Sequence, residues 1–167
     1  AFTTWLDFSL AAMQAEAIKN AFVKLMPDKK ADFDANFTSL VKDLAALDES
    51  MKAVAAKFKD TPLVVSHPVY QYWTKRYGLN TRSVHWEPDQ YPSQDQWNEF
   101  RELLKEHPAK YMIWEGRPGE TVEVLGKDMH VQSVIFDPCG AGPSERDFLF
   151  SMQQNIENMN LALEKNK

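Results

Sequence analysis

Short apolar runs alternate with amphipathic stretches through the second half of this sequence, and this alternation constrains the fold most. The apolar runs lie at 63–65, 81–86, 111–114 and 131–136. Helical patterns lie between them and after the last of them, at 68–77, 93–106, 119–127 and 144–164. Strands that alternate with helices favour a parallel sheet with right-handed crossovers. The sequence therefore predicts an α/β fold, with a small four-stranded parallel sheet flanked by helices.

A long helical pattern precedes the predicted sheet. Apolar residues recur at spacings of three and four from Phe37 to Phe58, which is typical of one face of a helix. The pattern predicts a long amphipathic helix over 28–59, about eight turns at 3.6 residues per turn, preceded by a helix over about 8–26. The charged residues on the other face of the long helix are expected to be solvated: Lys42, Asp43, Asp48, Glu49, Lys52 and Lys57.

Composition excludes several classes of function. The chain has 167 residues and a formal net charge of −5, so we expect no basic surface for nucleic acid. Its single cysteine, Cys139, cannot form an internal disulfide or a multi-cysteine metal centre. No apolar run of about 18 residues is present to span a membrane. The opening AFTTWLDF has no initiator Met and no signal-peptide pattern, so we interpret this start as processed or trimmed.

Each predicted strand is followed by side chains that can bind a metal or transfer a proton. In chain order these are His67, His85 with Glu87, Glu115 and Asp137. Ligands of an open parallel sheet bind beyond the carboxyl ends of its strands, so we expect a site at this edge. Imidazole and carboxylate groups suit zinc, manganese or ferrous iron. They also suit acid–base catalysis, but no nucleophile motif or glycine-rich phosphate loop accompanies them.

Each of these residues also has a structural interpretation. His67 could be satisfied by backbone groups, and Asp137 could cap its Asp-Pro turn. Glu115 could pair with a nearby arginine, and His85 could pack into the core. The thiol of Cys139 is expected to behave as a small hydrophobe. Two further histidines are predicted to be structural: His107 and His130.

A series of short motifs runs through the chain in order. They are Trp5-Leu6-Asp7, Val64-Val65-Ser66-His67, Tyr70, Tyr72, Tyr77-Gly78-Leu79, Pro92-Ser93, AKYMIWE ending at Glu115, Phe136-Asp137-Pro138, and Met152, Asn155 and Ile156. In this order they resemble the zinc/manganese solute-binding proteins of bacterial ABC transporters, across essentially the whole chain. Those proteins have two α/β lobes joined by a long rigid helix, with a metal between the lobes. The resemblance thus implies an N-terminal helix next to a missing N-terminal lobe (1–27), a connecting helix (28–59) and a C-terminal α/β metal-binding lobe (60–167).

The resemblance also implies ligands. His67 matches the third metal ligand of the family, and Asp137 matches a carboxylate ligand from the last strand. Glu115 matches a glutamate that we expect to orient a ligand. Thr3 stands where the family has its second ligand, a histidine, and the first ligand belongs to the missing lobe. A segment outside the family pattern, 85–89, supplies His85 as a candidate replacement ligand and Glu87 as an additional or orienting group.

The preferred interpretation is a metal-binding protein rather than an enzyme. The resemblance implies capture of Zn²⁺, with Mn²⁺ as the alternative, and delivery of the ion to an ABC permease from the periplasm or from a lipid-anchored position outside the membrane. Two other hypotheses stay open: a degenerate scaffold lobe that has lost part of its site, which the threonine at position 3 favours, and an unrecognised hydrolase or lyase. The face that a partner lobe would cover is a candidate surface for a homodimer or a domain swap.

Overall fold

Four short parallel strands form one sheet in the computed structural model, which describes residues 3–140 and 147–164. The strands are β1 (Pro62–Val65), β2 (Asn80–Ser83), β3 (Tyr111–Trp114) and β4 (Gln132–Ile135), in the spatial order β2-β1-β3-β4. The helices that connect and follow them are α3 (Gln71–Tyr77), α4 (Gln94–Glu106), α5 (Thr121–Met129) and α6 (Phe148–Glu164). The predicted four-stranded parallel α/β fold is confirmed.

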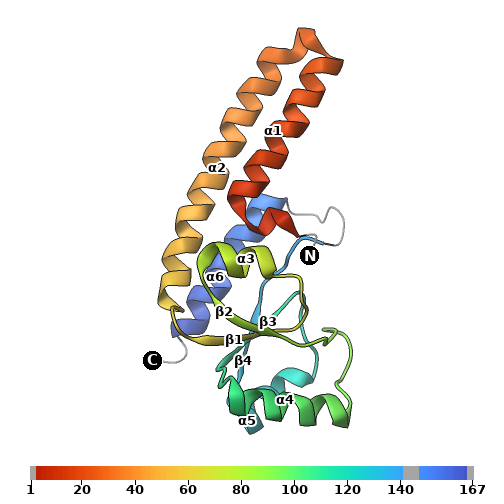
Figure 1. Cartoon of the computed structure of the whole chain (residues 1–167), viewed down its shortest axis with the longest axis vertical. Helices are drawn as coiled ribbons and strands as arrows, with labels where there is room; N and C mark the ends of the chain where they lie inside the picture. The colour runs from red at the N-terminus through yellow and green to blue at the C-terminus, as the bar shows by residue number, and fades with distance from the viewer. Residues whose placement is uncertain (1–2, 141–146, 165–167) are drawn as a thin grey trace.

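A helical hairpin extends from this sheet domain. It contains the 3₁₀ turn η1 (Thr4–Leu6), α1 (Phe8–Leu25), the turn η2 (Pro27–Lys29) and α2 (Lys30–Lys57). Figure 1 shows the two long helices side by side, reaching well beyond the sheet. The side chain of Asp7 caps α1 by accepting hydrogen bonds from the backbone N–H groups of Ser9 and Leu10. The long amphipathic helix expected before the sheet is therefore present as α2.

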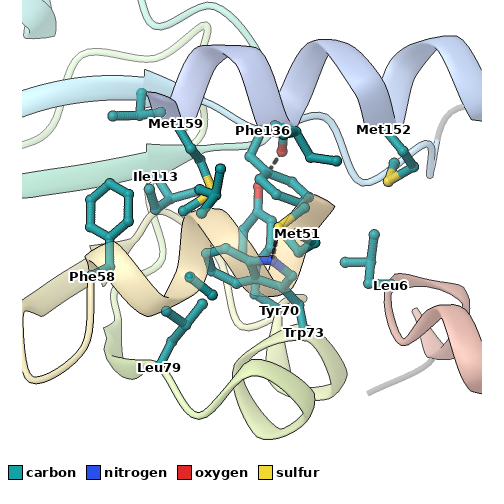
Figure 2. Packing of buried hydrophobic residues seen from close by; sticks show 14 of the residues in the cluster. Leu6, Met51, Phe58, Tyr70, Trp73, Leu79, Ile113, Phe136, Met152 and Met159 are labelled. Carbon is teal, nitrogen blue, oxygen red and sulfur yellow. Dashed lines mark hydrogen bonds between the residues drawn. The ribbon is translucent and has the colours of Figure 1, made fainter. Parts of the chain in front are cut away.

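Helices cover both faces of the sheet, so the strands are buried on both sides. Helices α2, α3 and α6 lie against one face, and α4 and α5 against the other (Figure 1). On the first face, Trp73 is fully buried and its Nε1 donates a hydrogen bond to Sδ of Met51, 3.4 Å away. The hydroxyl of Tyr70 donates to the carbonyl of Phe136 at 2.7 Å, as Figure 2 shows. This core joins the base of α2 to the sheet.

One residue of the charged face of α2 was assigned wrongly. Asp48 is only 7% exposed, because Arg76 of α3 packs over it. Nε and Nη2 of Arg76 donate to the two carboxylate oxygens of Asp48, at 2.6 and 2.7 Å. The hydroxyl of Tyr77 donates to the same carboxylate at 2.8 Å, and Nη1 of Arg76 lies 3.0 Å from Oδ1 of Asp7. Asp48 therefore ties α2 to α3, and Arg76 ties both to the N-terminus of α1.

The second strand ends earlier than predicted. The sequence predicts a strand over 81–86, but β2 ends at Ser83. The side chain of Trp86, beyond the end of β2, packs into the core of the second face, where its ring contacts Trp97 and Phe100 with both centroids at 4.8 Å. Residues 85–89 are consequently a loop, which lies at the edge where the functional residues were expected.

Gly78 ends α3 in a left-handed conformation, with φ of 63°. Because a Cβ is strained there although space is free around it, we expect Gly78→Ala to lower the free energy of unfolding by about 1 kcal/mol. Gly126, inside α5, also has free space but no such conformation, so Gly126→Ala is expected to stabilise by about 0.5–1 kcal/mol. Urea unfolding of both variants checks the opposite signs, and two variants of equal stability would contradict the expectation.

Large exposed apolar side chains gather on α1. They are Met13, Ile18, Phe22 and Leu25. Within residues 3–140 and 147–164, no helix is long and apolar enough to cross a membrane. A homodimer or domain swap through the face that a partner lobe would cover stays a prediction, and light scattering that detects only monomers would remove it.

Candidate metal site

The strand order decides which predicted site residues meet. His67 follows β1, the strand that lies between β2 and β3. The loop after β2 carries Glu87, and Glu115 follows β3 directly. Neighbouring strands are about 4.8 Å apart, so these three side chains converge at the carboxyl edge of the sheet. Each of them offers one potential ligand atom within 4.8 Å of those of the other two.

The imidazole of His67 lies between two carboxylates. Its Nε2 is 3.3 Å from Oε1 of Glu87, and its Nδ1 is 3.4 Å from Oε1 of Glu115. Nδ1 is buried and forms no hydrogen bond with the described residues. The ring of His85 meets that of His67 edge to face, with centroids 5.7 Å apart, and His85 is exposed rather than packed into the core. The side chain of His67 thus lies beside carboxylates, and the interpretation that backbone groups satisfy it is wrong.

The electrostatic field at this edge is negative. Burial raises the pKa of Glu115, and the carboxylates of Glu87 and Asp137 raise it further, while His67 opposes the shift. Burial also raises the pKa of Tyr70, with smaller contributions from Glu115 and Asp137. Carboxylates that are held together against their mutual repulsion favour a cation between them. A divalent ion would relieve this repulsion.

Asp137 lies outside the group of His67, Glu87 and Glu115. It follows β4, which is separated from β1 by β3, and its Oδ1 accepts a hydrogen bond from the backbone N–H of Cys139 at 2.7 Å. The side chain of Asn155, on α6, binds the backbone of Asp137 at two points. Oδ1 of Asn155 accepts a hydrogen bond from the Asp137 N–H at 2.9 Å, and Nδ2 of Asn155 donates one to the Asp137 carbonyl at 2.8 Å. Asn155 is 2% exposed, so it fixes this turn from beneath.

Thr3 is also buried at this end of the molecule. It is 1% exposed and its hydroxyl donates to the carbonyl of Val69, in the loop after β1. Trp5 makes a similar connection, because its Nε1 donates to the carbonyl of Pro138 at 2.7 Å. The segment before α1 is thus tied to the loops that carry His67 and Asp137.

Sequence reasoning missed several residues that build the site. The sequence pattern places Trp86 only at the end of a predicted strand, yet its burial fixes the course of the loop. The roles of Asn155 and Thr3 in holding other loops require contacts between residues more than 15 positions apart, which no local pattern reveals. His107 is buried and its Nε2 contacts the carbonyl of Leu63 at 3.0 Å, so its predicted structural role is confirmed.

The chemistry of this group fits a divalent ion. Zinc binds imidazole nitrogen and carboxylate oxygen at about 2.0–2.2 Å, so two of its ligand atoms lie roughly 3.3–3.6 Å apart in a tetrahedral site. The 3.3 Å between Nε2 of His67 and Oε1 of Glu87 meets this requirement. His67 and Glu87 could therefore supply two ligands to one ion that binds at Nε2 of His67.

A small parallel α/β lobe attached to a long helix is the architecture of the solute-binding components of metal importers. Residues 3–162 match the family described as ZnuA, zinc-uptake complex component A, periplasmic, and the chain belongs to this family. The zinc-binding protein AdcA of Streptococcus pyogenes serotype M6 is 26% identical over 166 residues, which is 95% of this chain and 32% of that protein. The high-affinity zinc uptake system protein ZnuA of Yersinia pestis is 27% identical over 142 residues, 83% of this chain and 44% of that protein.

Solved structures show the same fold. The Zn(II)-bound ZnuA-like domain of AdcA from Streptococcus pneumoniae superposes with a TM-score of 0.84 at 22% identity, covering 95% of this chain and 62% of that one. The metal-dependent lipoprotein YcdH of Bacillus subtilis gives a TM-score of 0.82 at 23% identity, over 93% of this chain and 61% of that one. The chain spans less than half the length of the two sequence relatives above.

Proposed function

We propose that this chain is the C-terminal metal-binding lobe of an extracytoplasmic solute-binding protein that captures zinc and delivers it to an ABC permease. In this proposal residues 1–27 adjoin an N-terminal lobe, 28–59 form the connecting helix and 60–167 form the metal-binding lobe. His67 is the principal ligand, and Asp137 is a second carboxylate ligand once the ion is held between lobes. The periplasm, or a lipid-anchored position outside the membrane, is the compartment of such a protein.

One observation supports the proposal most: both nitrogens of His67 face carboxylates, at 3.3 and 3.4 Å, on the edge where a parallel sheet binds its ligands. Zinc is preferred to manganese because the relatives above are named as zinc proteins and because an imidazole ligand suits zinc. Manganese favours sites that consist mostly of oxygen ligands, so the carboxylates at this edge keep it as the alternative.

A scaffold lobe without a metal is the second candidate, and the state of Thr3 favours it. Thr3 occupies the position at which the family pattern has a histidine ligand, and it is buried with its hydroxyl bonded to Val69. A threonine held in this way offers no imidazole to an ion. The scaffold function predicts that neither zinc nor manganese binds.

Calorimetric titration of the chain with zinc and, separately, with manganese tests the proposal. We expect about one zinc per chain with a Kd in the micromolar range or below, and weaker binding of manganese. If neither ion gives a saturable signal, the chain alone is not a metal-binding lobe and the scaffold function is favoured. The titration needs a non-coordinating buffer, because free ligands would compete with a site that lacks the donors of a second lobe.

A further inference from the structure

We infer that Glu87 is a direct metal ligand of this chain, sharing the ion with Nε2 of His67, while Glu115 orients the imidazole through Nδ1. The inference rests on the proposed function and assigns the roles of the two glutamates within that site. It also gives a use to the loop 85–89, which carries Glu87 to the edge of the sheet.

The two nitrogens of His67 face opposite ways, so one ion can bind at only one of them. Nδ1 is buried and lies 3.4 Å from Glu115, whose side chain is 26% exposed. Nε2 lies 3.3 Å from Glu87, whose side chain is 47% exposed. Solvent therefore reaches the pair on the Glu87 side, and an ion entering from solvent meets Nε2 and Glu87 first. The opposite nitrogen is left for a carboxylate, as in many sites where the second ring nitrogen of a histidine ligand is held by an acidic side chain.

The backbone position of Glu87 is fixed by the packing of its neighbour Trp86. Trp86 is 3% exposed, packs among the rings of the second core and donates its backbone N–H to the carbonyl of Ser66 at 2.9 Å. Because Trp86 points into the core, its neighbours His85 and Glu87 are left exposed at the edge. A loop held in this way presents its carboxylate with little loss of conformational freedom on binding.

The loop after β2 is also fastened to the loop after β3. The backbone N–H of Gly119 donates to the carbonyl of Pro88 at 3.2 Å, and the ring of Pro88 lies against Gly116, where an added Cβ would come within 3.4 Å of it. The two carboxylate-bearing loops are therefore fastened to each other. This fastening holds Glu87 and Glu115 next to the two nitrogens of the same imidazole.

The competing explanation is that Glu87 only contributes negative charge near the site. Three variants separate ligation from charge: Glu87→Gln removes the charge of the proposed ligand, and Glu87→His replaces it by another zinc ligand that carries no negative charge. Asp89→Asn removes the same charge two residues away, from an exposed side chain of the same loop. Both positions are at the surface, so circular dichroism should show an unchanged fold for all three variants.

Zinc affinity of these variants is measured by competition with a chromophoric chelator, using zinc alone as the probe. We expect Glu87→Gln to lower the affinity at least about tenfold, Glu87→His to stay within about tenfold of the wild type, and Asp89→Asn to change it by less than about threefold. If the wild type binds zinc and Glu87→Gln binds equally well, or if Glu87→Gln and Asp89→Asn lose affinity equally, the inference is wrong while the proposed function stands. A wild-type chain that binds no zinc overturns both.

Discussion

His67→Ala is expected to lower the affinity of this chain for zinc by at least about 100-fold, to the point where saturation is lost. The imidazole is the only nitrogen donor of the group formed with Glu87 and Glu115, and changes to residues that merely hold a metal ligand in place typically cost 10–100-fold. The same substitution leaves the carboxylates of Glu87 and Glu115 without the imidazole that contacts both of them. Calorimetric titration of wild type and variant, at equal concentration, measures the difference.

The matched control is His130→Asn. His130 is exposed, ends α5 with φ of 55°, and lies before β4, at the opposite edge of the sheet. Asparagine tolerates this left-handed conformation, so the variant should fold normally and bind zinc like the wild type. Equal zinc affinity of His67→Ala and wild type would mean that the ion binds elsewhere in the chain.

Asp48→Ala is expected to lower the free energy of unfolding by about 2–4 kcal/mol, the largest effect on stability predicted here. The change removes the acceptor of two short hydrogen bonds from Arg76 and one from Tyr77, and it removes a carboxylate that Lys52 contacts at 2.8 Å. Arg76 keeps its ion pair with Asp7, its hydrogen bond to Ser9 and its stacking on the Tyr77 ring, but it loses its bidentate partner, and breaking a partly buried charge pair is costly. Urea denaturation followed by tryptophan fluorescence measures the change.

Glu49→Ala is the control, because Glu49 is the next residue of α2 and its side chain is 75% exposed, pairing only with Lys52. We expect it to change stability by less than about 0.5 kcal/mol. Similar losses for the two variants would show that the Asp48 network contributes no more than an exposed ion pair.

The effect of Asp48 should depend on pH. Burial opposes its ionisation, but hydrogen bonds from Arg76, Lys52 and Tyr77 outweigh burial and hold its pKa well below the ordinary 3.8. A lowered pKa means that the stabilisation is fully present above the ordinary value and is lost as the pH falls towards the folded value. The stability difference between wild type and Asp48→Asn should therefore be constant from pH 7 to about pH 5 and shrink below about pH 4. A difference that grows on acidification would contradict this.

The class of fold could be predicted because periodicity is a local property. The apolar run at 111–114 and the spacing from Phe37 to Phe58 follow from strand and helix geometry alone, and β3 and α2 lie where these patterns place them. The burial of Asp48 could not be predicted in the same way. Periodicity describes a single helix, whereas Arg76 reaches Asp48 from 28 residues away, so only the packing of α3 on α2 reveals the pair.

The candidate site was predicted as a set of residues but not as an arrangement. The sequence places His67, Glu87, Glu115 and Asp137 after four strands, yet it does not contain the order of those strands in the sheet. The order β2-β1-β3-β4 puts Glu87 and Glu115 on either side of His67 and leaves Asp137 one strand further away. The ligand roles of all four residues stay predictions.

X-ray absorption at the zinc edge, on the chain loaded with less than one equivalent of zinc, tests the central claim most directly. We expect one imidazole nitrogen and carboxylate or water oxygens at about 2.0–2.2 Å, and no sulfur at about 2.3 Å. The thiol of Cys139 is expected to stay out of the site because Cys139 does not belong to the group of His67, Glu87 and Glu115. A spectrum of hydrated zinc without imidazole scattering, or one with a sulfur ligand, would contradict a metal site built on His67.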